Sequence, residues 1–102
     1  MSKRILLALS TTAIILASQS AFAFDYPGMQ YEHDAKITMH QAQLLALKAY
    51  PGTIVEEKLK YKLGGSGLRY SFDIVGHHMT HDVAVDAKTG KILKNTRDTD
   101  GN

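Results

Sequence analysis

The sequence predicts an α+β fold, in which one N-terminal helix packs on one face of a three- to four-stranded antiparallel β-meander. Apolar and polar residues alternate through Leu68–Val75 and again through Thr80–Asp86, and a turn signal closes each run. Apolar residues at helical spacing occupy Ile37–Tyr50. Alternation is typical of strands with one buried side, and the 3.6-residue period is typical of an amphipathic helix.

The two alternating runs share a clear division of parity. In the first run, one parity holds Leu68, Tyr70, Phe72 and Ile74, and the other holds Arg69, Ser71 and Asp73. Since successive strand side chains point to opposite faces, one face is expected to be buried and the other to meet water. In the second run, Val83 and Val85 continue the apolar parity. Gly76 and Gly90 supply permissive backbone for the two reversals.

The helix has a recognisable start and stop. Thr38 followed three residues later by Gln41 fits a capping box, which satisfies two backbone groups at a helix N-terminus. Pro51 cannot continue the helical hydrogen bonds, so the helix is expected to end at Tyr50. Its apolar stripe is expected to cover the sheet, and it consists of Ala42, Leu45, Ala46 and Ala49.

Ile54–Leu63 reads as the first strand and residues 64–67 as its turn. Closing the first hairpin on 64–67 and the second on 76–79 places both apolar sets on one face, and a one-residue slip would invert this agreement. The first register opposes Leu63 to Leu68, Tyr61 to Tyr70, Leu59 to Phe72 and Lys58 to Asp73. The second opposes Ile74 to His81, Phe72 to Val83, Tyr70 to Val85 and Arg69 to Asp86. Lys91–Leu93 can return as a short last strand.

The first 23 residues resemble a secretory signal peptide. Two cations precede a short apolar stretch, and an A-x-A site predicts cleavage between Ala23 and Phe24. The alternative is an uncleaved membrane anchor, for which the stretch is too short. The expected organisation is therefore a signal peptide (1–23), a flexible N-terminal arm (24–36), a domain (37–94) and a disordered tail (95–102). The protein is expected to be periplasmic or secreted.

Charge and composition exclude several partners. The whole chain has 12 Lys and Arg against 10 Asp and Glu, and loss of Lys3 and Arg4 with the leader leaves 10 − 10 = 0. A neutral mature chain does not favour nucleic acid or an anionic membrane as a partner. No cysteine is present, so no disulfide braces the fold. Such a small domain has marginal stability, and we expect a monomer or a weak dimer.

Candidate ligand chemistry centres on the histidines. His77, His78 and His81 are the candidates for a metal or other ligand, whereas His33 and His40 lie elsewhere. In an extended strand, His77 and His81 would stand roughly 13 Å apart, too far to share one ion. His81 shares the parity of Val83, which favours the core edge, and the other two histidines are expected at a loop tip. No metal site or cofactor is therefore predicted.

The predicted register places Asp73 opposite Asp82 on the open face, with Lys58 beside Asp73. Two close carboxylates can raise one another's pKa or hold a cation, although such a row is more often a solvated surface. A nucleophile is poorly supplied, because the mature chain has only Ser66 and Ser71 and no G-x-S-x-G motif. The chain is not expected to be an enzyme, and no catalytic residue is assigned.

Several segments together resemble the PepSY domain family. The resemblance covers about Ile37–Leu93, and it rests on structural rather than catalytic motifs. Ile37-Thr38 opens an Ala/Leu helix that Ala49-Tyr50-Pro51-Gly52 closes, and the strand Val55–Leu63 follows. The remaining pieces are Arg69-Tyr70-Ser71-Phe72-Asp73-Ile74 and the most specific block, Val83–Leu93. The histidines of the second turn depart from the family pattern.

The resemblance implies a function without catalysis. PepSY domains occur in propeptides of thermolysin-like metallopeptidases and in small exported proteins, and they are associated with restraining peptidases. We therefore expect an exported binding protein whose partner is a peptidase or another envelope protein. Its docking surface is expected to be an unpaired strand edge or the open face, with Lys58, Lys60, Arg69, Ser71 and Asp73. A His-rich metal- or ligand-binding protein is the alternative.

Overall fold

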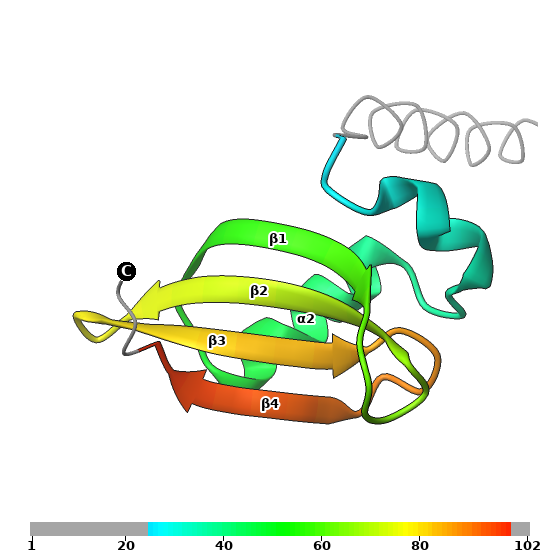
Figure 1. The fold of residues 1–102 in the computed structure, drawn as a ribbon. Coiled ribbons are helices and arrows are strands. Elements are labelled where there is room, and N and C mark those ends of the chain that lie inside the picture. Colours follow the sequence, from blue (N-terminus) through cyan, green and yellow to red (C-terminus); the bar gives the residue numbers. More distant parts are fainter. Residues whose placement is uncertain (1–24, 99–102) are drawn as a thin grey trace, which may run out of the picture.

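The computed structural model describes residues 25–98, in which one α-helix packs against one face of a four-stranded antiparallel sheet (Figure 1). The elements are the 3₁₀-helix η1 (Met29–Asp34), α2 (Met39–Ala49), β1 (Thr53–Tyr61), β2 (Leu68–Gly76), β3 (Met79–Asp86) and β4 (Ile92–Arg97). The strands neighbour one another in chain order, so the sheet is a meander. The predicted α+β fold is confirmed. The predicted signal peptide and its cleavage site lie outside the described residues.

The predicted capping box starts α2. The Thr38 hydroxyl accepts a hydrogen bond from the Gln41 backbone N–H at 3.0 Å, and the Gln41 side chain accepts from the Thr38 N–H at 2.9 Å. Tyr50 follows in extended geometry, just before Pro51. Ala42 and Ala46 are fully buried, and their small side chains let the helix approach the sheet closely. The helix therefore covers one sheet face and leaves the other open.

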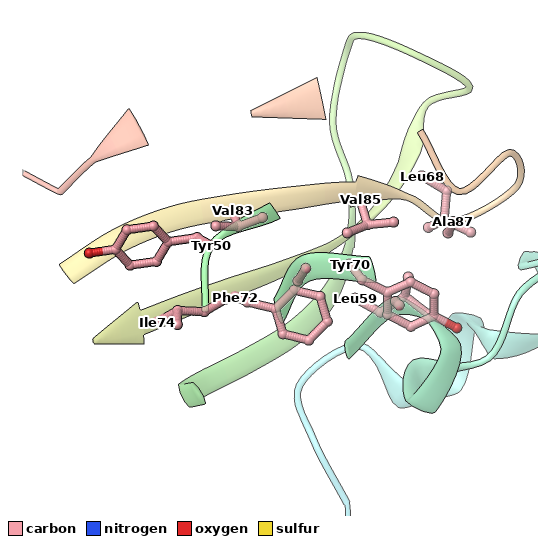
Figure 2. Packing of buried hydrophobic residues seen from close by; sticks show 11 residues of the cluster. Tyr50, Leu59, Leu68, Tyr70, Phe72, Ile74, Val83, Val85 and Ala87 are labelled. Carbon is pink, nitrogen blue, oxygen red and sulfur yellow. The ribbon is translucent and has the colours of Figure 1, made fainter. Parts of the chain in front are cut away.

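The core lies between α2 and the sheet. Apolar side chains from the three longest strands meet there in a continuous cluster (Figure 2), made of Leu59, Leu68, Tyr70, Phe72, Ile74, Val83 and Val85 with Tyr50 and the helix alanines. Tyr50 closes one end of the cluster, because its hydroxyl donates to the carbonyls of Gly76 at 2.5 Å and Met79 at 3.2 Å. The Tyr70 hydroxyl donates to the Ile37 carbonyl at 2.8 Å.

The second hairpin has the predicted register. Its pairs include Ile74 with His81, Phe72 with Val83, Tyr70 with Val85 and Arg69 with Asp86. The turn itself differs from expectation, because Gly76 ends β2 and the positive φ angles fall on His77 (52°) and His78 (62°). Two consecutive positive φ angles in a two-residue loop are the signature of a type I′ turn, whose twist matches that of the strands.

The register predicted for the first hairpin is wrong by two residues. The structure pairs Tyr61 with Leu68, Leu59 with Tyr70 and Lys58 with Ser71, because β1 ends at Tyr61 and the loop contains six residues, 62–67. Three of its glycines, Gly64, Gly65 and Gly67, have positive φ. A shift of two residues preserves parity, so the predicted division into faces survives. Leu63, expected to lie opposite Leu68, is instead 94% exposed in the loop.

A β-bulge in β1 decides which side chains share a face. The pairing shifts between Ile54 and Glu56, so Val55 is the extra residue. Without the bulge, Ile54 and Leu59 would point to opposite faces; with it, both face the core. Glu56 follows the bulge and lies on the open face beside Lys58, two residues along the strand.

The segments at both ends of the domain are more regular than predicted. Residues expected in a flexible arm form η1, and the Leu59 N–H donates to the Pro27 carbonyl at 2.9 Å, which joins this segment to β1. The expected short last strand is observed as β4, which begins at Ile92 and continues to Arg97, within the expected tail. Neither segment has a hydrophobic period of its own, and hydrogen bonds join both to neighbouring strands.

Candidate functional site

The sheet face turned away from α2 carries charge in rows that run across the strands. This polar face consists of Glu56, Lys58, Lys60, Arg69, Ser71, Asp73, Asp82, Ala84, Asp86, Lys94 and Thr96. One row contains Lys60 and Arg69 and ends at Asp86, and the next has Lys58 and Lys94 at its two ends with Ser71 and Ala84 between them. The third contains Glu56, Asp73 and Asp82. Apart from Asp86, strand pairing separates a basic half of the face from an acidic one.

The acidic row (Glu56, Asp73 and Asp82) holds three carboxylates on three neighbouring strands. The pKa of Asp73 is raised to about 6, first by burial, then by the hydrogen bond and negative charge of Glu56, and then by the charges of Asp82 and Asp98. Lys94 donates to Asp82 at 2.8 Å, and this contact raises the Lys94 pKa. Within residues 25–98, neither Glu56 nor Asp73 forms an ion pair. In the described chain, Lys94 thus matches one of the three carboxylates of the row, and Glu56 and Asp73 have no such cation.

The basic group (Lys58, Lys60, Arg69 and Lys94) shows the opposite imbalance. Burial lowers the pKa of Lys60, and the positive charges of Lys58, Lys62 and Arg69 lower it further. Arg69 is only 8% exposed; its Nη2 donates to the Leu63 carbonyl at 3.2 Å, while its buried Nε has no hydrogen-bond partner in the described chain. Lys94 is paired with Asp82, whereas Lys58 and Lys60 form no ion pair within residues 25–98.

Small side chains form the floor between the charges. Ser71 is 7% exposed and Ala84 1% exposed, although both lie on the polar face. A shallow hollow of about 220 Å³ lies over this region, and Glu56, Lys58, Lys60, Ser71, Asp73 and Asp82 are among its lining residues. The depth arises because long side chains at the strand edges stand around short ones in the centre.

The predicted docking residues do share one face, but they are not equally accessible. Lys58, Lys60 and Asp73 are half-buried, whereas Arg69 and Ser71 are buried rather than exposed as expected. Lys58 neighbours Ser71, and the residue opposite Asp73 is Glu56. Sequence reasoning missed Glu56 because the two-residue error in register placed Lys58, rather than Glu56, opposite Asp73.

The three candidate histidines do not converge on one point. His77 and His78 are exposed in the turn, and the His81 ring stacks on Tyr50 with centroids 3.7 Å apart and planes 4° from parallel. Its Nδ1 lies 2.8 Å from the Asn95 side-chain oxygen. The expected position of His81 at the core edge is thus observed. Among residues 25–98, no three His, Cys, Asp or Glu side chains are placed to hold a metal ion.

Asp86 organises the end of the sheet where the β1–β2 and β3–β4 loops meet. Its carboxylate accepts hydrogen bonds from the N–H groups of Ser66 (2.6 Å), Lys88 (2.8 Å) and Thr89 (3.1 Å), and from the Ser66 hydroxyl (2.7 Å). Burial alone would raise the Asp86 pKa, but these hydrogen bonds outweigh it and lower the pKa to about 2. The carboxylate is fully occupied and has a structural role.

A family model described as "Peptidase propeptide and YPEB domain" matches residues 36–96, more than half of the chain. The match spans α2 and the whole of β1, β2 and β3 together with nearly all of β4. The chain belongs to the PepSY family. PepSY domains are in general propeptide-like and non-catalytic. No curated protein and no solved structure matches the chain significantly.

The segment before the PepSY match is fastened to the domain by tyrosines. The Tyr61 hydroxyl of β1 donates to Asp34, which raises the pKa of Tyr61 and lowers that of Asp34. The Tyr61 ring also meets the Tyr31 ring edge-on, with centroids 4.8 Å apart. Gly28 is needed here, because a Cβ at this position would collide with the Leu59 backbone. No helix of the described part is long and apolar enough to cross a membrane.

Proposed function

We propose that this PepSY protein is an exported, non-enzymatic binding protein that restrains a peptidase, and that the polar face is its docking surface. Membership of a family described by peptidase propeptides supports the class of partner. The observation that carries the docking surface is the separation of charge on a rigid, open sheet face. The partner would be met in the periplasm or outside the cell.

The mechanism would be recognition by complementary charge. A partner loop that carries a carboxylate would meet the basic group, and a neighbouring Lys or Arg would meet the acidic row. Complementary charges mainly raise the association rate and fix the orientation of a complex, whereas packing at the centre sets its lifetime. The small floor at Ser71 and Ala84 would admit the partner's side chain between the rows.

The test is affinity capture from envelope extract with the tagged protein purified after export. We expect the wild type to recover a peptidase and to inhibit it in a peptide-hydrolysis assay. The double variant Lys58→Glu/Lys60→Glu should weaken inhibition by about tenfold or more, since two interfacial charges are reversed. The control Lys36→Glu/Lys48→Glu changes net charge equally, with both positions exposed and away from the polar face. Capture of no peptidase, or equal loss in both variants, would refute the proposal.

A further inference from the structure

The division of charge on the polar face would allow a two-fold symmetric contact between two copies of the chain. Its acidic row and basic group lie on opposite sides of a line that crosses the strands between Asp73 and Ser71. Rows two residues apart along a strand are separated by about 7 Å. A two-fold axis along this line, just above the sheet, brings the acidic row of one copy over the basic group of another, and the reverse contact forms at the same time.

Charged residues in both halves of the polar face also have no ion-pair partner in the described part of the chain. Glu56 and Asp73 have no ion-pair partner within residues 25–98, and the same holds for Lys58 and Lys60. Burial raises the pKa of Asp73 and lowers that of Lys60, and neighbouring like charges add to both effects. A facing row of opposite charge would favour the charged forms of both Asp73 and Lys60.

The centre of the face permits close approach. Ser71 and Ala84 are cross-strand neighbours in the row next to the proposed axis, and both have nearly no exposed surface. The backbones of two sheets can therefore come near at this row without bulky side chains between them. The charged residues stand around this floor as a rim. Such an arrangement resembles the polar rim of a small interface, with the charges setting register.

We propose that two copies of this chain pair through their polar faces in an isologous dimer, with the acidic row of each copy over the basic group of the other. The dimer covers the surface assigned above to a peptidase, so self-pairing and peptidase binding are mutually exclusive. Since the contact is mainly between partly exposed charges, the dimer is weak and salt-sensitive.

Sedimentation of the protein purified after export tests this inference without any peptidase. The wild type should sediment as a monomer–dimer equilibrium, with its dissociation constant rising about tenfold or more between about 50 mM and about 500 mM salt. The control Lys36→Glu/Lys48→Glu should dimerise like the wild type. A wild type that stays monomeric at millimolar concentration in low salt overturns the dimer while leaving the peptidase proposal standing.

A charge swap gives the sharper result. Lys58→Glu/Lys60→Glu makes the face acidic, and Glu56→Lys/Asp73→Lys makes it basic, so each variant alone should be monomeric. An equimolar mixture should form a heterodimer, which general loss of folding cannot produce. Circular dichroism of each variant confirms its fold, and two folded variants that fail to associate when mixed contradict the proposed pairing.

Discussion

The side chains on the two faces of the sheet differ in the contacts that they make. On the face under α2, apolar side chains contact one another and hydroxyls such as those of Tyr50 and Tyr70 have carbonyl partners. On the polar face, carboxylates adjoin carboxylates and lysines adjoin lysines, although groups of opposite sign lie only one row away. The difference indicates that the covered face stabilises the fold. On the open face, Lys94 is paired with Asp82, but Glu56, Asp73, Lys58 and Lys60 form no ion pair within residues 25–98.

The largest effect should come from the covered face. Phe72→Ala removes a ring that is 1% exposed and lies between α2 and three strands. We expect a loss of about 3–5 kcal/mol in the free energy of unfolding, from lost burial and the cavity left behind. Urea denaturation followed by circular dichroism measures it. A loss below about 1 kcal/mol would contradict the division between the two faces.

Asp86→Ala should give the next largest loss of stability. Unlike the other carboxylates of the polar face, Asp86 has all its hydrogen-bond partners within the fold. Asp86→Ala leaves the N–H groups of Ser66, Lys88 and Thr89 without their acceptor in a buried site, so we expect a loss of about 3 kcal/mol. The lowered pKa means that the stabilisation is complete above the unfolded pKa of 3.8 and is lost as the pH falls towards about 2. As the pH is lowered from about 6 to about 2, the melting temperature should fall in the wild type and change less in the variant.

These two faces also mark what the sequence could predict. The alternation in Leu68–Asp86 predicted both the division into faces and the register of the second hairpin, because a short turn leaves little freedom between the strands. The capping box predicted the start of α2. Such signals are local, and one stretch of chain contains all the residues that decide them.

The errors arose where the structure depends on distant contacts. The length of the first loop depends on Ser66 reaching Asp86, twenty residues away, so the glycine-rich sequence alone allowed a shorter turn. The pairing of Glu56 with Asp73 depends on the register that this loop sets, and the Tyr61–Asp34 contact joins η1 to β1. The sequence therefore predicted which sheet face carries the candidate site. It did not predict that Glu56 belongs to the site or that Arg69 is buried there.

A smaller and opposite effect is expected on the polar face. Asp73→Asn removes one charge from a row that also faces Glu56, Asp82 and Asp98. The wild-type pKa of about 6 lies above the unfolded value of 3.8, so Asp73 should lower stability progressively as the pH rises from about 4 to 6. The variant should lack this decline and be about 1 kcal/mol more stable at pH 7, after allowance for solvent screening.

Equal stability of the Asp73→Asn variant and the wild type at pH 7, with the same decline between pH 4 and 6, would contradict the account of crowded carboxylates. Asp25→Asn serves as the matched control, because Asp25 is exposed and lies outside the acidic row. Chemical denaturation at several pH values supplies both comparisons.

The smallest effect on stability is expected for Lys60→Gln, on the polar face. Lys60→Gln removes a half-buried cation whose pKa is lowered by burial and by Lys58, Lys62 and Arg69. Because the positive charge is disfavoured where it stands, its loss should change the free energy of unfolding by less than about 0.5 kcal/mol, or raise it slightly. A clear loss of stability would mean that Lys60 already has its counter-charge within the fold. Unchanged stability combined with weaker peptidase inhibition would instead show that Lys60 contributes to binding the peptidase and not to folding.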